Sequence, residues 1–417
     1  MKLRLANATI FDSTSKFHLQ KTNLLIEDGI ITKIGDFSEG KSIDLKGKYL
    51  SPGWVDMSAN FSEPGLEHKE DTISGSNCAV KGGFTDVCLV PNTYPPIESK
   101  GDVQFVLAQS KAVSLWPLAA LSEGLKGENL TEILDLHKHG AVGFTDGLNP
   151  IWNSELLLKA LQYMHKFDGL VIDRPKDLAL SKYMQMHEGV MSTSLGLNGE
   201  PSLSEELMIL RDIEILRYAG GRIHFSNIST KKSVDLIKRA KKIGLRVTCD
   251  VAINNLIFTD DDLETFDTNY KVDPPFRTER DRKALIRGLN EGVIDAIASA
   301  HQPQDQECKD LEFDLADFGT ISLQTVFSSL VSIKEELPLE VSFQKLTTGP
   351  RGILGFDKIS IAEGGVAKLA IFDLEAEWTF DNKTNQSKSI NSPYFGKKLK
   401  GKAIGIINKR IVSLEGY

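Results

Sequence analysis

The feature that most constrains the fold is an alternation that runs from about residue 54 to residue 300. Short apolar runs rich in β-branched residues alternate there with longer amphipathic stretches, which is typical of repeated βα units around a parallel sheet. Stretches such as SELLLKALQYMHKF repeat their apolar positions every three and four residues, as a helix does. The predicted strands are WVDMSANF (54–61), TDVCLVP (85–91), LWPLAAL (115–121), AVGFTD (141–146), GLVIDR (169–174), RIHFSN (222–227), RVTCDVAI (246–253) and VIDAIASA (293–300).

Eight strands with covering helices predict an α/β fold, a (β/α)8 TIM barrel, which needs about 250 residues. We place the barrel at residues 53–357, of which 326–357 form a linker or helical segment that brings the chain back. Both chain ends read instead as short strands, and isolated hairpins are only marginally stable in water. We therefore expect residues 1–52 and 358–417 to form one small composite β-sandwich domain beside the barrel.

The composition is that of a soluble globular protein without covalent cross-links. Hydrophobic residues make up 41% of the 417 positions, and no apolar run approaches the roughly 20 residues that span a bilayer. The cysteines at 78, 88, 249 and 308 lack the paired spacing of a zinc site or a disulfide framework. The net charge of −8 leaves no basic block beyond short runs such as KKLKGK, so nucleic acid is not an expected partner. We expect a cytoplasmic protein without membrane contact.

Several segments together resemble the type I dihydroorotases of the amidohydrolase superfamily. Their order and spacing hold over almost the whole chain, which makes the resemblance more specific than a single short motif. GGVAKLAIFD and GKKLKGKAIGIINKRIV also resemble that family's C-terminal sandwich strands. The segments that carry the resemblance are SPGWVDMSANFSEPG, LVPNTYPP, GFTDG, HEGVMSTSLGLNGEPS, SNIST, VDPPFRTERDRKALIRGLNEGVIDAIASAHQP and DFGTISLQT.

The resemblance implies a barrel that binds one or two divalent metal ions at the carboxyl ends of its strands, where barrel active sites lie. It implies the reversible closure of carbamoyl aspartate to dihydroorotate in pyrimidine biosynthesis. This chemistry uses a metal because coordination lowers the pKa of water from about 15.7 to about 7 and polarises the amide carbonyl. Whether the chain can do this depends on the residues at the ligand positions.

Most ligand positions that the resemblance implies hold side chains of another chemistry. Ser58 and Asn60 replace the His-x-His of the first strand, and Ser62 replaces the arginine that clamps the substrate carboxylate. The carboxylate after strand four is retained as Asp146, whereas Arg174 replaces the histidine after strand five. The remaining replacements are Asn227 on strand six, Asn254 and Asn255 after strand seven, and Ala300 at the aspartate that serves as ligand and base on strand eight.

These replacements predict a barrel without a metal site and without a catalytic base. Zinc is held by nitrogen, sulfur or carboxylate donors, usually at least three from the protein, and a neutral amide oxygen is at best a calcium ligand. We therefore expect no cofactor, and zinc only if the chain is an active enzyme with an unusual site. We also expect Arg174 to occupy the metal region and to pair with Asp146, because an unpaired buried charge is costly.

Other residues of the family's substrate pocket are kept or exchanged. Asn92 matches a substrate contact but suits a turn after strand two equally well. Asp273 replaces an asparagine and would repel an acidic substrate, while Phe318 and Gly319 align with a loop that contacts the substrate through its backbone. We expect His301 to be a packed, hydrogen-bonded histidine. The pocket candidates are Asn60, Ser62, Asn92, Asp146, Arg174, Asn227, Asp273, His301, Gln304, Phe318 and Gly319.

The sequence thus predicts a dihydroorotase-like protein of pyrimidine biosynthesis that has lost its hydrolase activity. Non-catalytic chains of this kind are structural partners of aspartate transcarbamoylase, so the resemblance implies a structural or regulatory partner of that enzyme. We also expect a homo-oligomer. One alternative is an active dihydroorotase, or a related amidohydrolase that acts on hydantoin or allantoin. Another is a barrel that binds a pyrimidine intermediate without converting it.

Overall fold

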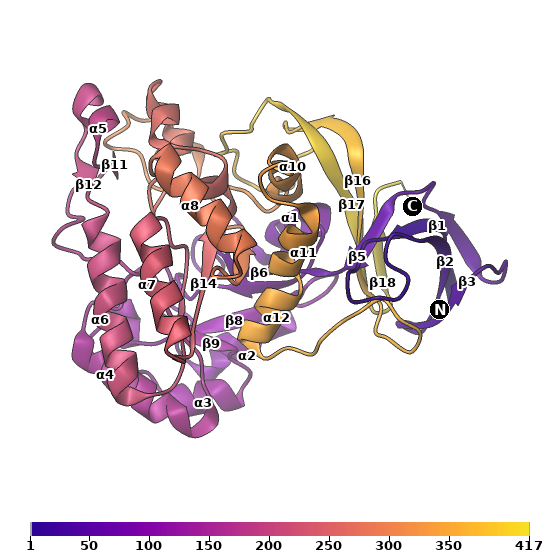
Figure 1. Cartoon of the computed structure of the whole chain (residues 1–417), viewed down its shortest axis with the longest axis horizontal. Coiled ribbons are helices and arrows are strands. Elements are labelled where there is room, and N and C mark those ends of the chain that lie inside the picture. The colour runs from indigo at the N-terminus through magenta and orange to yellow at the C-terminus, as the bar shows by residue number, and fades with distance from the viewer. Residues whose placement is uncertain (1, 417) are drawn as a thin grey trace.

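The predicted barrel is present in the computed structural model, which describes residues 2–416 (Figure 1). Its eight parallel strands lie in the order β15-β14-β13-β10-β9-β8-β7-β6. Each overlaps one of the predicted strands. The bounds are β6 (Trp54–Ala59), β7 (Phe84–Leu89), β8 (Ser114–Ala120), β9 (Gly143–Thr145), β10 (Val171–Asp173), β13 (Ile223–Phe225), β14 (Val247–Ala252) and β15 (Ala296–Ala298).

The first and last strands meet near their carboxyl ends. A parallel bridge joins Ala59 to His301, and the amide of Asn60 donates a hydrogen bond of 2.8 Å to the carbonyl of His301. Deeper in the barrel, the carboxylate of Asp56 on β6 accepts bonds from the amide and the hydroxyl of Ser299, both at 2.6 Å. Burial raises the pKa of Asp56 to about 6. These contacts close the ring of strands that positions the site.

Helices cover the outside of the barrel and turn apolar faces toward the strands. Helix α1 begins after Asp71, whose carboxylate accepts a bond of 2.7 Å from the amide of Ser74. It ends at Gly83, where φ is 89° and a Cβ would lie 2.6 Å from the ring of Trp54, so only glycine fits. The barrel helices are α1 (Thr72–Gly82), α2 (Lys100–Ala108), α3 (Ile133–Lys138), α4 (Ser154–Met164), α6 (Leu203–Ala219), α7 (Lys231–Lys242) and α8 (Glu279–Asn290).

The segment at 326–357 is largely helical. Its helices are α10 (Val326–Ser332), α11 (Leu339–Leu346) and α12 (Thr348–Leu354). Short elements in the loops are α5 (Val190–Leu195), α9 (Gln306–Lys309), β11 (Met186–His187), β12 (Gly199–Glu200), and the 3-10 turns η1 (Glu123–Leu125), η2 (His165–Phe167), η3 (Ile253–Leu256), η4 (Asp260–Leu263) and η5 (Thr268–Tyr270). Among residues 2–416, no helix combines the length and the apolar character that crossing a membrane requires.

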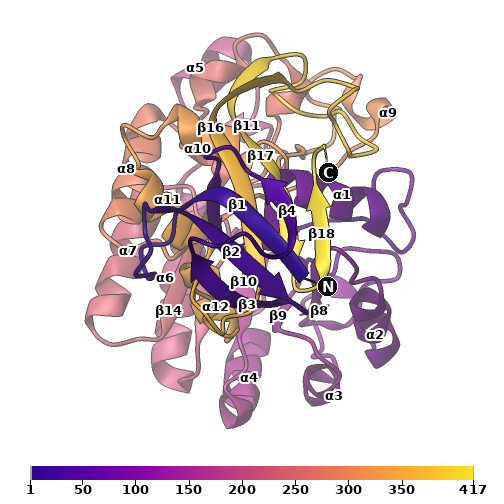
Figure 2. The same ribbon diagram turned by 90° about the vertical axis from the view of Figure 1, so that its right-hand side faces the viewer.

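Both chain ends build one sheet beside the barrel, as predicted (Figure 2). Its order is β18-β17-β16-β5-β1-β2-β3, with β4 paired to β1. The two ends are joined where β5 pairs antiparallel with β16, with Leu50 opposite Ile371. The strands are β1 (Lys2–Ile10), β2 (Lys21–Glu27), β3 (Ile30–Gly35), β4 (Lys41–Asp44), β5 (Tyr49–Pro52), β16 (Lys368–Thr379), β17 (Lys398–Asn408) and β18 (Ile411–Leu414).

An aromatic cluster joins this sheet to the barrel. The ring of Phe372 on β16 lies 4.9 Å from the ring of Phe327 and 4.9 Å from that of Phe343, measured between centroids. The ring of Trp54 at the start of β6 lies 6.0 Å from Phe372. Because all four rings are buried, they form a shared apolar core that fixes the sheet domain against the barrel.

The cysteines are free thiols, as the sequence predicts. Cys78, Cys88 and Cys249 are buried, and Cys308 is partly exposed. Burial raises the pKa of each of the three buried thiols. They therefore act as small apolar groups of the core.

Candidate functional site

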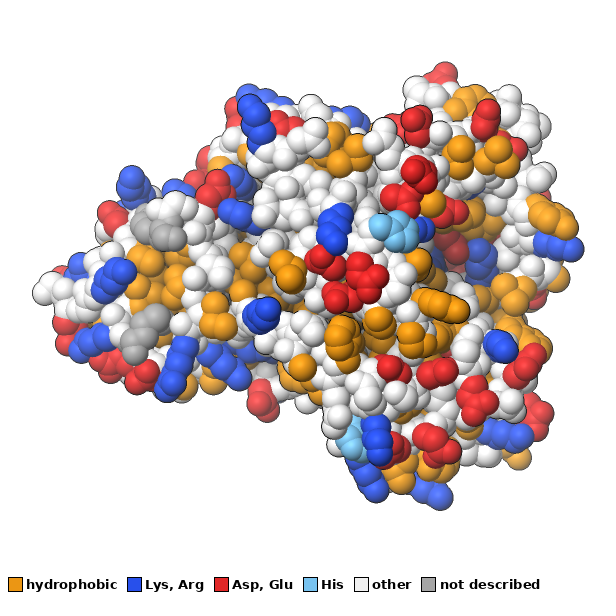
Figure 3. Space-filling model, turned by 180° about the vertical axis from the view of Figure 1, so that it is seen from behind, with side chains coloured by type: hydrophobic (Ala, Val, Ile, Leu, Met, Phe, Trp, Pro, Cys, Tyr) orange, Lys and Arg blue, Asp and Glu red, His pale blue; other side chains and the backbone are white. Residues whose placement is uncertain are grey.

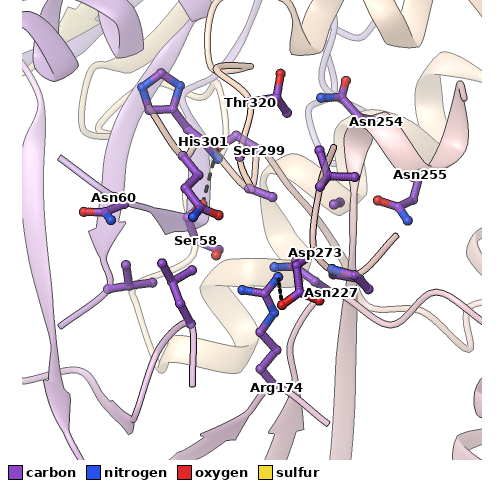
Figure 4. A pocket seen from close by; sticks show the side chains of 18 of the residues that line it. Ser58, Asn60, Arg174, Asn227, Asn254, Asn255, Asp273, Ser299, His301 and Thr320 are labelled. Atoms are coloured by element: carbon purple, nitrogen blue, oxygen red, sulfur yellow. Dashed lines mark hydrogen bonds and ion pairs between the residues drawn. The ribbon is translucent and has the colours of Figure 1, made fainter. Parts of the chain in front are cut away.

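A polar cavity lies at the carboxyl ends of the barrel strands, where the resemblance places the metal centre (Figure 4). Its volume is about 30 Å³, which is room for one or two water molecules. The predicted site positions that line it are Ser58, Asn60, Arg174, Asn227, Asn254, Asn255, Asp273, Ala300, His301 and Gly319. The predicted positions outside this lining are Ser62, Asn92, Asp146, Gln304 and Phe318.

An ion pair stands in this cavity. Arg174, which directly follows β10, places its Nη2 atom 3.6 Å from Oδ2 of Asp273, and Figure 4 shows the two side chains facing each other. Lys176 approaches the same carboxylate at 2.9 Å. Burial acts to raise the pKa of Asp273, but Arg174 and Lys176 outweigh it and lower this pKa to about 2. Two cations thus compensate the charge of one carboxylate, and the repulsion of an acidic substrate by Asp273 stays a prediction.

The predicted pair of Arg174 with Asp146 was also wrong. The carboxylate of Asp146 turns toward the loop after β8 and accepts bonds from the amide of Ser122 at 2.9 Å and from its hydroxyl at 2.6 Å. Burial raises the pKa of Asp146. A serine and its backbone therefore satisfy this carboxylate without a cation.

The ion pair continues into a buried chain of charges that the sequence did not reveal. Lys176 lies 3.7 Å from Glu200, and Glu200 lies 2.7 Å from Arg277. Arg277 also lies 3.2 Å from Nδ1 of His187, and burial together with Arg277 lowers the pKa of His187 to about 4. Arg277 lies in the segment VDPPFR that carries the resemblance, and Lys176 follows the predicted strand GLVIDR. Nothing in the local sequence pattern pairs either cation with Glu200.

The polar side chains at the ligand positions that the resemblance implies are only partly satisfied. The Oδ1 atom of Asn60 accepts a bond of 2.8 Å from the amide of Ser62. By contrast, Oδ1 of Asn227, Oδ1 of Asn254 and Nε of Arg174 are buried without a partner among the described residues. Buried polar atoms around a cavity of this size are suited to hydrogen bonds with small polar molecules such as water.

His301 is a packed, hydrogen-bonded residue, as predicted. Its Nδ1 atom accepts a bond of 3.1 Å from the amide of Ser322. Its Nε2 atom lies 3.4 Å from Oε2 of Glu70 and can donate a hydrogen bond to it. Glu70, Cys78 and His301 bring their donor atoms within 4.8 Å of one another. Burial raises the pKa of the Cys78 thiol, which disfavours the thiolate form that zinc binds.

Other predicted pocket residues hold loops in place. The side chain of Asn92 accepts a bond of 2.8 Å from the amide of Leu148 and donates one of 3.3 Å to the carbonyl of Asp146, so it joins the loops that follow β7 and β9. Gln304 donates a bond of 2.7 Å to the carbonyl of Phe318. At Gly319, φ is 136° and a Cβ would lie 2.7 Å from a backbone carbonyl. The loop after β15 is therefore closely packed and requires glycine at this position.

The side chains at the implied ligand positions do not fit a zinc centre. The hydroxyl of Ser58 and the amides of Asn60 and Asn227 are neutral oxygen donors, which suit zinc poorly. Arg174 can only donate hydrogen bonds, and Ala300 has no donor atom. The carboxylate of Asp146, after strand four, is bonded to a serine and does not line the cavity.

Comparisons with known proteins agree with this fold. A family model described as "Dihydro-orotase-like" matches residues 47–233. A protein of Ruminiclostridium cellulolyticum named dihydroorotase is 39% identical over 96% of this chain and 96% of its own length. A second, from Acetivibrio thermocellus, is 38% identical over 94% of this chain and 95% of its own length.

The solved structures that resemble the chain include an L-hydantoinase (dihydropyrimidinase) from Arthrobacter aurescens. It superposes with a TM-score of 0.87 at 22% identity and covers 99% of this chain and 96% of its own. A D-hydantoinase superposes with a TM-score of 0.84 at 20% identity, over 100% of this chain and 95% of its own. These structures share the fold, and the sequence relatives show that the chain belongs to the dihydroorotase family of the amidohydrolase superfamily.

Proposed function

We propose that this chain is a dihydroorotase-family protein without hydrolase activity that acts as a structural or regulatory partner of aspartate transcarbamoylase. The observation that carries the proposal is the pair of Arg174 with Asp273, 3.6 Å apart in the barrel mouth. A guanidinium there opposes the binding of a divalent cation, because like charges repel strongly in a site shielded from water.

Loss of activity follows from the chemistry of the remaining groups. Hydrolysis of a cyclic amide needs an activated water, and in this family a metal and an aspartate supply that activation. Ala300 stands at the aspartate position, and the loss of a general base alone costs about 100-fold to 10,000-fold in rate. The loss of the metal adds to this. Together these losses leave the barrel as a binding scaffold.

The surface offers apolar contact area that suits a scaffold role. Figure 3 shows hydrophobic side chains gathered in patches among the charged ones on the rear face. On α6, Leu203, Leu207 and Leu210 are 43%, 41% and 44% exposed, and their spacing of four and three residues places them on one helix face. Exposed apolar patches are typical of protein interfaces. The α6 face supports the proposed homo-oligomer, which light scattering of the wild type and of Leu207→Glu would test.

Co-expression with aspartate transcarbamoylase tests the proposed partner. We expect the two proteins to co-purify, and we expect the transcarbamoylase to lose activity or stability when this chain is omitted. Omission with no effect on that enzyme, together with failure to co-purify, would refute the partner role. A hydrolase-negative result alone would not establish it.

The second candidate is an active dihydroorotase or a related amidohydrolase with an unusual zinc site. It is favoured by relatives that are 39% and 38% identical and carry the name dihydroorotase. The assay supplies zinc, cobalt or manganese and measures turnover of dihydroorotate, then of hydantoin and allantoin. Turnover above about 1 per second lies in the ordinary range of enzymes and would replace the first proposal.

A further inference from the structure

A second cavity lies at the opposite end of the barrel from the mouth. Its volume is about 430 Å³, which is within the range of small-molecule sites. It lies beside the amino-terminal halves of β7 and β8, where Asp86 and Trp116 line it, and beside the start of β16, where Lys368 does. The crossing segment at 355–366 forms another wall. The cavity thus sits between the barrel and the sheet domain, where binding sites are common.

The inner wall of this cavity carries more positive than negative charge. The single carboxylate of Asp86 lies 2.8 Å from Nη2 of Arg351 and 2.5 Å from Nζ of Lys368. Arg351 is 4% exposed, and its Nε atom has no hydrogen-bond partner among the described residues. One carboxylate is therefore shared between two buried cations, one of which keeps an unused donor.

The rim adds further positive charge. Lys358 and Lys409 line the cavity, and within residues 2–416 neither has an ion pair. Asp357 is the one additional acidic residue of the lining. Four cationic side chains thus face two carboxylates, which suits an anion with more than one negative charge.

An aromatic surface lies beside these charges. The rings of Trp116 and Phe356 are 4.6 Å apart between centroids and inclined by 39°. Both side chains line the cavity and are only partly buried. A flat heterocycle stacks favourably on such rings.

We propose that this cavity binds a nucleoside monophosphate. The phosphate would lie against Lys358, Lys409 and Arg351, and the base would stack against Trp116 and Phe356. The site is separate from the barrel mouth and does not depend on whether the chain is a catalyst or a partner protein.

Calorimetric titration of the full chain with UMP, uridine and ribose phosphate tests the proposal. UMP is expected to bind at least about tenfold more tightly than either fragment, a difference of about 1.4 kcal/mol, because only UMP uses the charged and the aromatic walls together. Absence of binding by UMP, or ribose phosphate binding as tightly as UMP, would overturn the assignment.

Two variants locate the binding. Lys409→Gln should weaken UMP and ribose phosphate by about tenfold and leave uridine unchanged, since it removes a phosphate contact. Phe356→Leu should weaken UMP and uridine and leave ribose phosphate unchanged. Lys358→Gln, on an exposed loop, repeats the first test if Lys409→Gln does not fold. Lys242→Gln on the exposed face of α7 is the matched control and should bind UMP as the wild type does. UMP affinity equal to that of the control in all the cavity variants would refute this location.

Discussion

The ion pair at the barrel mouth gives a stability prediction whose size follows from its geometry. Asp273→Asn removes the carboxylate that lies 3.6 Å from Arg174 and 2.9 Å from Lys176. Burial opposes the charged form, yet the two cations lower the pKa of Asp273 from 3.8 to about 2. At about 1.4 kcal/mol per pKa unit, the ionised carboxylate contributes about 2 kcal/mol to the free energy of unfolding. We expect the variant to lose roughly this amount.

Urea unfolding followed by tryptophan fluorescence near neutral pH measures the loss. Asp235→Asn, at an exposed position of α7, is the control and should change the free energy of unfolding by no more than about 0.5 kcal/mol. The folded pKa of Asp273 is the lower one, so its contribution is present above pH 3.8 and is lost as the pH falls toward 2. The gap between wild type and Asp273→Asn should therefore close over that window. A variant as stable as the control, or a gap that widens in acid, would refute the reasoning.

Three further substitutions test other parts of the structure. Asp86→Asn leaves two buried cations without their carboxylate and should cost about 3 to 5 kcal/mol in the same unfolding measurement; a loss below about 1 kcal/mol would contradict this. Gly319→Ala places a Cβ 2.7 Å from the carbonyl of Gln302 at a φ of 136° and should lower the free energy of unfolding by about 1 to 3 kcal/mol. An unchanged urea midpoint would contradict this prediction. Burial and Arg277 lower the pKa of His187 from 6.5 to about 4, so part of the stability of the wild type is lost as the pH falls from 6.5 to about 4. His187→Asn should lose less stability over this window, and a pH profile identical to that of the wild type would contradict this.

The barrel could be predicted because its signal is local and repeated. Each strand is a short β-branched run, each helix repeats its apolar positions every three or four residues, and the count of eight closes a ring. The β9 and β10 strands are shorter than their predicted spans, at Gly143–Thr145 and Val171–Asp173. Apolar residues precede both strands, Ala141 and Val142 before β9 and Leu170 before β10, so hydrophobicity alone does not mark where pairing begins.

The site could be predicted only in part, for a related reason. The chemistry at a position is read from its own side chain, so the neutral amides of Asn60 and Asn227 could be read from the sequence. The partner of a charge is a long-range contact and leaves no local pattern. We therefore predicted an ion pair of Arg174 with Asp146. In the structure, the hydroxyl of Ser122 donates a hydrogen bond to Asp146, and Arg174 forms its ion pair with Asp273.

Metal content tests the central claim most directly. The full chain is purified without chelator from medium supplemented with zinc, and its zinc, cobalt and manganese are measured by elemental analysis. We expect well below one equivalent of metal, because the barrel mouth presents neutral amides and a compensated guanidinium pair in place of zinc donors. One or more tightly held equivalents of zinc, together with dihydroorotate turnover that disappears on chelation, would contradict the claim.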